Sequence, residues 1–260
     1  MMEKIAIGEQ VNLSLQESQF HLLQAERLST IGKMAALLAH EIRTPLVSIG
    51  GFARRMLRST PPDDPRHEEM EIIVSEVRRL EKLVDEVLVY SRISKPEYKP
   101  TDINVLVQSV MITMRGELQK NSVRVKLDLD SGLPAAETDE AQLRQALFNL
   151  VTNALEAMPS GGILELTTRF DEKYLEIGVA DTGVGINKEN WDRLFTPFFT
   201  TKSTGTGLGL AIVSQVVDNH NGSLRFESIP GQGTSFHIRL ALHPDRATLP
   251  DSLPKGDPVS

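Results

Sequence analysis

The sequence predicts an α+β protein, with a helical first half followed by a mixed layer of helices and strands. Apolar residues recur at helical spacing through residues 9–58 and again after the proline-rich turn at 59–66. Beyond the proline-punctuated linker at 94–100, stretches of strict apolar–polar alternation are interleaved with helical patterns. This change of period predicts two domains, the second with helices packed on one face of a sheet.

Composition excludes several classes of protein. The net charge is -7 over 260 residues, so the chain has no general basic footprint for nucleic acid. It has no cysteine, which excludes a disulfide framework and thiolate metal sites. No apolar run reaches the roughly 20 residues that span a bilayer, and the first ten residues do not resemble a signal peptide. We therefore expect a cytoplasmic protein without a membrane span.

The first half is predicted to be a helical hairpin. Two long helical patterns flank a loop whose prolines cannot continue a helix. Each pattern carries an apolar stripe, formed in the first helix by Ile31, Ala35, Leu38, Ile42, Ile49 and Met56, and in the second by Ile73, Val77, Leu80, Val84, Val87 and Leu88. A lone hairpin would leave such a stripe in water. Two hairpins pairing into a four-helix bundle would cover it, so we expect a homodimer.

The second half is predicted to contain three helices and five strands. The helices are expected at 102–120, 139–158 and 208–220, and the strands at 123–129, 163–170, 174–181, 223–228 and 234–242. Asp139 is a candidate N-cap for the second of these helices. The polar, proline-spaced tail at 244–260 cannot bury enough surface to offset its ordering entropy, so we expect it to be disordered.

His40 is a candidate reactive residue in the first helix. At about 100° per residue it lies almost opposite the apolar stripe and therefore faces solvent. Glu41 follows it and could accept a proton from the ring, while Thr44 lies one turn further on. Pro45 removes the N–H partner of the Glu41 carbonyl, so the helix is expected to bend there. An exposed histidine without a role remains an alternative on this stretch alone.

Asn149 and Asn153 are one turn apart in a strongly apolar helix. Asparagine is a poor helix former, and a buried amide must be satisfied. The two residues could join the helix to a loop. Alternatively, an amide oxygen could bind Mg²⁺, which takes few protein ligands.

Two glycine-containing segments follow strands or precede helices. "DTGVGI" (181–186) places Asp181 at a strand end, and its glycines permit close approach of the backbone. "TKSTGTGLGLAIV" (201–213) leads into a helix whose free N–H groups could bind phosphate. It is neither a Walker loop nor a Rossmann fingerprint. About 20 residues without a regular pattern separate the two segments, as in many lids.

Together, in this order, these pieces resemble the sensor histidine kinases of two-component signalling. The H, N, G1, F and G2 boxes of that family correspond to "HEIRTPL", "NLVTNALEAM", "DTGVGI", "LFTPFFTTK" and "GTGLGLAIV", and "GQGTSF" resembles its glycine-rich motif before the last strand. The sequences "NALEAM" and "FTPFFTTK" within these boxes are most similar to those of the nitrogen-regulation-like branch of the family. The resemblance covers roughly residues 25–242.

The resemblance implies four segments. Residues 1–24 would be a signalling helix, similar to the exit helix of a GAF-type sensor. Residues 25–95 would form the dimerisation and histidine-phosphotransfer domain. Residues 100–243 would form an ATP-binding domain of the GHKL (Bergerat) type, an α/β two-layer sandwich, and 244–260 the tail.

The resemblance also implies residue roles. His40 would be the phosphoacceptor, Glu41 its base, and Thr44 the residue that orients water for dephosphorylating the partner. Asn153 would be the main Mg²⁺ ligand with Asn149 supporting it, and Asp181 would bind the adenine amino group. The remaining expected ATP contacts are Gly183, Gly185, Lys202, Gly205, Gly207, Gly209 and Thr234.

The implied activity is ATP-dependent phosphorylation of His40, then transfer to an aspartate of a response-regulator receiver domain. Phosphatase activity toward that regulator is a further expectation. Two alternatives remain: a GHKL ATPase and a catalytically silent dimeric scaffold. The ATPases use a glutamate base at the position of Asn149, and an amide cannot take a proton from water.

Overall fold

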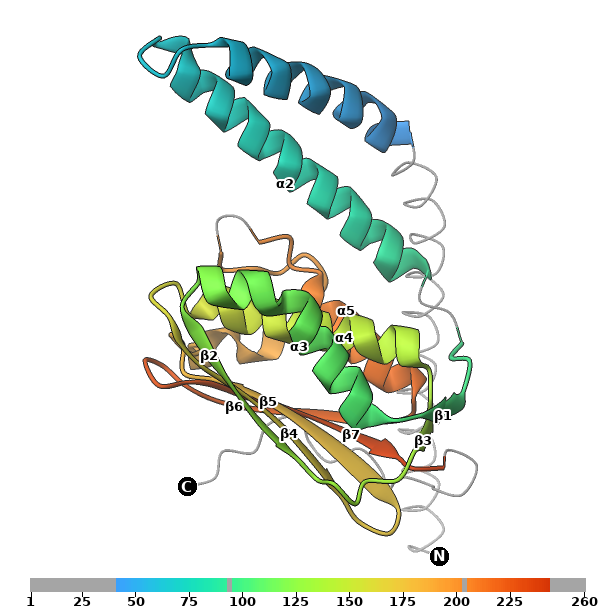
Figure 1. The fold of residues 1–260 in the computed structure, drawn as a ribbon. Helices are drawn as coiled ribbons and strands as arrows, with labels where there is room; N and C mark the ends of the chain where they lie inside the picture. Colours follow the sequence, from blue (N-terminus) through green and yellow to red (C-terminus); the bar gives the residue numbers. More distant parts are fainter. Residues whose placement is uncertain (1–40, 93–94, 203–204, 244–260) are drawn as a thin grey trace, which may run out of the picture. The chain divides into compact units, whose positions relative to one another are not determined.

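The computed structural model describes residues 41–92, 95–202 and 205–243. The chain divides into two units, Met1–Arg92 and Ile93–Ser260. The expectations for the signalling helix at 1–24, for His40 and for the tail at 244–260 lie outside the described residues. The fold class is confirmed, because a helical hairpin precedes an α/β sandwich (Figure 1).

The first unit is a hairpin of a helix over residues 41–59 and α2 (Arg66–Arg92). The predicted turn between them is confirmed, and the Asp64 carboxylate accepts the Arg66 N–H at 2.9 Å where α2 begins. Leu46 packs with Val84 and Leu88 of α2. Gly50 lets the helices come close, because a Cβ there would lie 2.9 Å from Val77 Cγ1.

The part of the predicted stripe that lies in the described residues of the first helix is not the face that packs within the hairpin. Ile42, Ile49 and Met56 are 47%, 51% and 52% exposed, whereas Leu46 and Ala53 are buried. The helical period predicts an apolar side of the first helix, but this side is wider than one partner helix can cover. The second helix packs against only one edge of this apolar side.

The second unit contains a five-stranded sheet of order β2-β4-β5-β7-β6. The bounds of its members are β2 (Val123–Leu129), β4 (Gly162–Phe170), β5 (Tyr174–Asp181), β6 (Ser223–Ile229) and β7 (Gly233–Ala241). β2 and β4 are parallel, and the other neighbouring pairs are antiparallel. The predicted hairpins are thus confirmed, each within one residue of its expected bounds.

Three helices cover one face of this sheet (Figure 1): α3 (Ile103–Lys120), α4 (Glu140–Ala157) and α5 (Gly209–Asn219). Asp102 caps α3 by accepting the Val105 N–H, and Asp139 caps α4 by accepting the Gln142 N–H at 3.1 Å, as predicted. α5 ends in a Schellman motif, in which Asn221 has a φ of 51° and the Gly222 N–H donates to Val217. The core lies between these helices and the sheet.

Three elements, two short strands and a 3₁₀ helix, were not predicted. β1 (Lys99–Thr101) pairs with β3 (Ala136–Thr138) in a separate two-stranded sheet. The 3₁₀ helix η1 (Lys188–Arg193) lies in the stretch expected to be irregular. Three-residue strands and a six-residue 3₁₀ helix are too short to show a period.

Candidate active site

Asn149 and Asn153 lie where α4 passes the start of α5. Both side chains are half-buried. A Cβ added at Gly209, the first residue of α5, would lie 3.6 Å from Asn153 Nδ2 and 3.9 Å from Asn149 Cβ. The N–H groups at the start of α5 have no partners within the helix, so they and the two amides face one small region. The structure thus brings two predicted motifs together.

The amide of Asn149 is incompletely satisfied. Its Nδ2 is buried and has no hydrogen-bond partner among the described residues. The oxygen and nitrogen of a side-chain amide are told apart only by their hydrogen bonds. The atom without a partner therefore marks a buried polar position at which a bound ligand could supply the missing interaction. The described residues contain no cluster of three or more His, Cys, Asp or Glu that could hold a metal ion. Amide oxygens such as those of Asn149 and Asn153 are oxygen ligands that fit a Mg²⁺ ion sharing its coordination shell with phosphate and water.

Lys202 binds to this same face of α4. Its Nζ lies 2.7 Å from Glu156 Oε2 and donates to Asn153 Oδ1 at 3.3 Å. Lys202 was expected among the ATP contacts, whereas Glu156 was not singled out from the sequence. The signal was present, since Glu156 lies three residues after Asn153 and shares its helix face.

Asp181 ends β5 and is half-buried. Burial raises the pKa of its carboxyl, against the opposing effects of the Gly183 and Thr234 N–H groups and the charge of Lys202. The carboxylate accepts the Gly183 N–H at 2.8 Å. A buried acceptor near a cationic side chain suits recognition of an amino group on a ligand.

Thr234 lies opposite Asp181 in the register of β5 and β7 and is buried. Its hydroxyl forms a hydrogen bond of 2.9 Å with Ser228 Oγ, which also accepts the Ile186 N–H at 2.8 Å. The threonine therefore holds the 181–186 loop against β6 and β7 through Ser228. Ser228 was not predicted, because an isolated strand serine gives no sequence signal.

Most of the candidate glycines allow chain segments to pack closely. A Cβ at Gly183 would lie 2.5 Å from the Ala157 carbonyl oxygen, and one at Gly185 would lie 2.3 Å from that of Ile229. Gly207 has a φ of 73°, and its Cβ would lie 2.4 Å from Phe198 C. A Cβ at Gly205 would come too close to Thr200 Oγ1. These glycines shape the loops of the site, whereas Gly209 is the one beside the asparagines.

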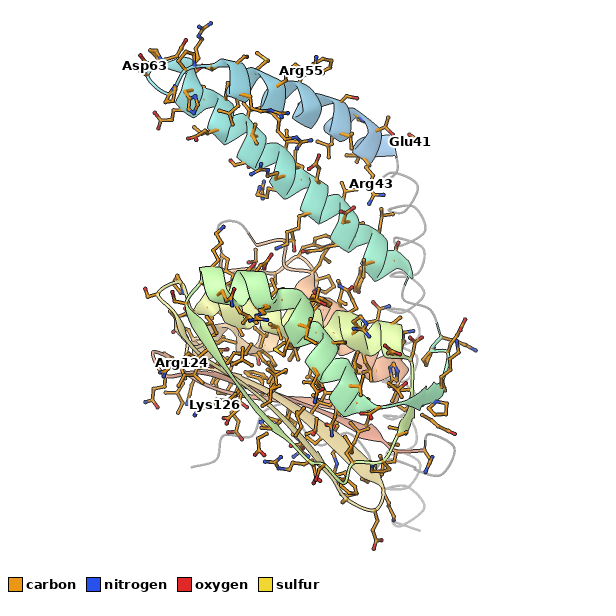
Figure 2. The ribbon with its side chains drawn as sticks, in the orientation of Figure 1. Glu41, Arg43, Arg55, Asp63, Arg124 and Lys126 are labelled. Atoms are coloured by element: carbon orange, nitrogen blue, oxygen red, sulfur yellow. The ribbon has the colours of Figure 1, made fainter. Side chains whose placement is uncertain are left out.

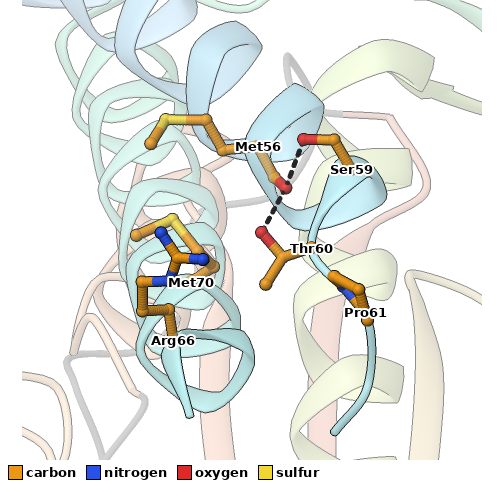
Figure 3. A pocket seen from close by; sticks show the side chains of 6 residues that line it. All are labelled: Met56, Ser59, Thr60, Pro61, Arg66 and Met70. Carbon is orange, nitrogen blue, oxygen red and sulfur yellow. Dashed lines mark hydrogen bonds between the residues drawn. The ribbon is translucent and has the colours of Figure 1, made fainter. Parts of the chain in front are cut away.

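Glu41 and Thr44 lie in the first described turns of the hairpin and are exposed, with Glu41 labelled in Figure 2. Between them in sequence, Arg43 forms an ion pair with Asp85 of α2. The far end of the hairpin holds a hollow of about 270 Å³ lined by Met56, Ser59, Thr60, Pro61, Arg66 and Met70 (Figure 3). The hydroxyls of Ser59 and Thr60 both donate to the Met56 carbonyl, so they are already engaged.

Two family models match the chain in succession. Residues 30–96 match the His Kinase A (phospho-acceptor) domain, and residues 138–244 match the histidine kinase-, DNA gyrase B- and HSP90-like ATPase. The chain therefore belongs to the histidine kinases with this pair of domains.

Among its relatives, the signal transduction histidine-protein kinase AtoS of Escherichia coli K12 is 32% identical over 88% of this chain and 38% of its own length. Sporulation kinase A of Bacillus subtilis is 33% identical over 84% of this chain and 36% of its length. The chain spans about half or less of the curated relatives it matches.

Solved structures give the same result. Histidine kinase ThkA in complex with the response regulator TrrA has a TM-score of 0.64 at 31% identity, covering 85% of this chain and 65% of that one. Full-length ShkA in complex with AMPPNP has a TM-score of 0.65 at 30% identity, covering 80% and 45%. None of the described helices is long and apolar enough to cross a membrane.

Proposed function

We propose that this chain phosphorylates His40 with ATP and passes the phosphoryl group to an aspartate of a response-regulator receiver domain. The observation that carries the proposal is that three predicted features lie together on one face of α4. These are Asn153, Lys202 and the start of α5. Amide oxygens, a cation and free backbone N–H groups in one region form a site for a metal-bound polyphosphate.

ATP is the nucleotide that the chain's own groups would bind. We assign Asp181 to the adenine amino group, with Thr234 and the glycines at 183 and 185 behind it. We assign the start of α5 and the loop containing Gly205, Gly207 and Gly209 to the phosphates. Asn153, supported by Asn149, would hold Mg²⁺, which when bound neutralises charge on the phosphate oxygens.

The phosphoryl transfer itself would use two residues of the first helix. One nitrogen of neutral His40 attacks the γ-phosphorus, forming an N–P bond as the bond to the ADP oxygen breaks. Glu41 takes the proton from the other ring nitrogen. The exposed carboxyl of Glu41 is available for this role, because no hydrogen bond or ion pair engages it among the described residues.

The partner would be a receiver domain, which the ThkA–TrrA complex supports by analogy. Thr44 would orient water for dephosphorylating it, making the protein bifunctional. The "NALEAM" and "FTPFFTTK" wording supports the nitrogen-regulation-like branch, and the composition supports a cytoplasmic protein.

We propose a homodimer, supported by apolar side chains that the hairpin leaves in solvent. On one side of its first helix these are Ile42, Ile49, Phe52 and Met56, and on α2 they are Ile72 and Ile73. Two copies packed as a four-helix bundle would bury them.

Incubation with γ-labelled ATP and Mg²⁺ tests the proposal. We expect acid-labile, base-stable label on the protein that His40→Gln abolishes. Free phosphate without protein label would indicate a GHKL ATPase instead. An absence of both products would indicate a silent scaffold.

A further inference from the structure

The ammonium group of Lys202 donates a hydrogen bond to the Asn153 amide oxygen, the atom that we propose as a ligand of Mg²⁺. We infer that Lys202, held by Glu156, is an internal cation that takes the place of Mg²⁺ at Asn153 until nucleotide and metal bind. Glu156 is then a positioning residue, and the pair sets how much Mg²⁺ the site requires. This inference rests on the proposed function, because it concerns the same site.

The contacts that support it are direct. The Lys202 ammonium lies 2.7 Å from Glu156 Oε2 and 3.3 Å from Asn153 Oδ1. An ammonium has three donors and no acceptor, so both neighbours can only be accepting from it. The lysine thus bridges a carboxylate and an amide oxygen on one face of α4, as a cation ligated by both would.

Mg²⁺ and the ammonium cannot occupy Asn153 together. Two positive charges a few ångströms apart repel, and the repulsion is stronger at a partly enclosed site than in water. Binding of Mg²⁺ at the amide oxygen therefore requires Lys202 to leave. When Lys202 leaves, its ion pair with Glu156 is broken. The free energy lost with this ion pair makes Mg²⁺ binding weaker by the same amount.

The nearby charges explain why an internal cation is useful there. Without Lys202 the site would present the carboxylate of Glu156, and the charge of Lys202 also opposes the burial that raises the pKa of Asp181. The lysine offsets negative charge that would repel phosphates. Once displaced, it is free to contact a phosphate.

An ordinary surface ion pair is the competing explanation. The side chains of Lys202 and Glu156 are 38% and 36% exposed, so the pair alone contributes little to stability. Glu140 and Arg144 form a comparable pair on the same helix, with 56% and 34% of their side chains exposed. That pair touches neither asparagine, so it provides the matched control.

The test titrates MgCl₂ into the full chain with a fluorescent ADP analogue and measures the Mg²⁺ concentration for half-maximal binding. ADP has no γ-phosphate, so a γ-phosphate contact of Lys202 cannot influence the result. We expect Glu156→Gln and Lys202→Met each to lower that concentration about two- to fivefold, the range for one exposed ion pair. The double variant should show no further change, because both substitutions remove one interaction.

Glu140→Gln should match the wild type. With ATP the two site variants should diverge, because Lys202→Met also loses the phosphate contact and Glu156→Gln does not. Unchanged or raised Mg²⁺ midpoints in the site variants would overturn the inference. Failure of the wild type to bind nucleotide would instead contradict the proposed function.

Discussion

The backbone N–H of Asp139 donates to His220 Nε2 at 3.0 Å, which joins the start of α4 to the end of α5. The other ring nitrogen, Nδ1, lies 2.8 Å from the Val216 carbonyl oxygen and must carry the proton. The ring is buried and meets Tyr98 edge-on at 5.6 Å between centroids. The fold therefore requires a neutral histidine at this position.

This requirement predicts a pH-dependent stability for the second unit. Burial lowers the pKa of His220 below its usual 6.5, against weaker opposing effects of the Val216 carbonyl and the Asp139 carboxylate. Below pH 6.5 the unfolded chain therefore binds a proton that the folded chain does not, so stability falls as the pH falls through that value. Urea unfolding at pH 8 and pH 5.5, followed by the fluorescence of the single tryptophan, Trp191, measures the effect.

His220→Gln is the matching variant, because an amide oxygen can still accept the Asp139 N–H and does not titrate. We expect it to be about 1–3 kcal/mol less stable at pH 8, from lost packing and an imperfect hydrogen bond. Its loss of stability between pH 8 and pH 5.5 should be smaller than that of the wild type. An equal loss would mean that other groups cause the pH dependence.

Substitution of two glycines should separate folding from nucleotide binding. Gly207→Ala places a Cβ 2.4 Å from Phe198 C at a positive φ, so it should destabilise the second unit by about 1–3 kcal/mol or more. Gly209→Ala meets nothing closer than 3.6 Å and should leave the unfolding transition unchanged. It should still weaken ATP binding by crowding the start of α5. If Gly209→Ala bound ATP with normal affinity, the start of α5 could not be part of the phosphate site.

The exposed apolar face of the hairpin predicts which substitutions would dissociate the proposed dimer. Ile49→Glu places a charge on that face, and each buried apolar side chain contributes roughly 1.5–3 kcal/mol. The dimer dissociation constant should rise about tenfold or more in analytical ultracentrifugation. Val47 is equally exposed, at 54%, but projects from a different side of the helix, so Val47→Glu should remain dimeric.

Thr44→Ala should preserve labelling of His40 but reduce dephosphorylation of the regulator, because it removes the side chain that we propose to orient water. The comparison of both rates in one preparation tests this role. Equal dephosphorylation by variant and wild type would show that the threonine has no such role.

Pro45→Ala should change the balance between kinase and phosphatase, because it restores the N–H partner of the Glu41 carbonyl. The helix runs through Pro45 without interruption from 41 to 59. Measurement of both activities tests the prediction, which unchanged activities would contradict.

The three helices of the second unit, the five strands of its large sheet and the order of its candidate motifs could all be predicted from the sequence. Asp139 marked the start of α4 because a side-chain acceptor before an apolar period is a local signal. The alternation in 163–170 and 174–181 located a hairpin because the partner strands are adjacent in the chain. These features depend on neighbours within a few residues, and the sequence records them directly.

Which distant segments meet could be seen only in the folded chain. The fold placed β2 parallel to β4 and paired β1 with β3, although α3 and β2 lie between them in the chain. It left apolar residues of the first helix in solvent. It also joined Lys202 to Glu156, which lie 46 residues apart. Periodicity reports which side of an element is apolar, but packing of the whole chain selects its partner, because many segments offer equally apolar surfaces.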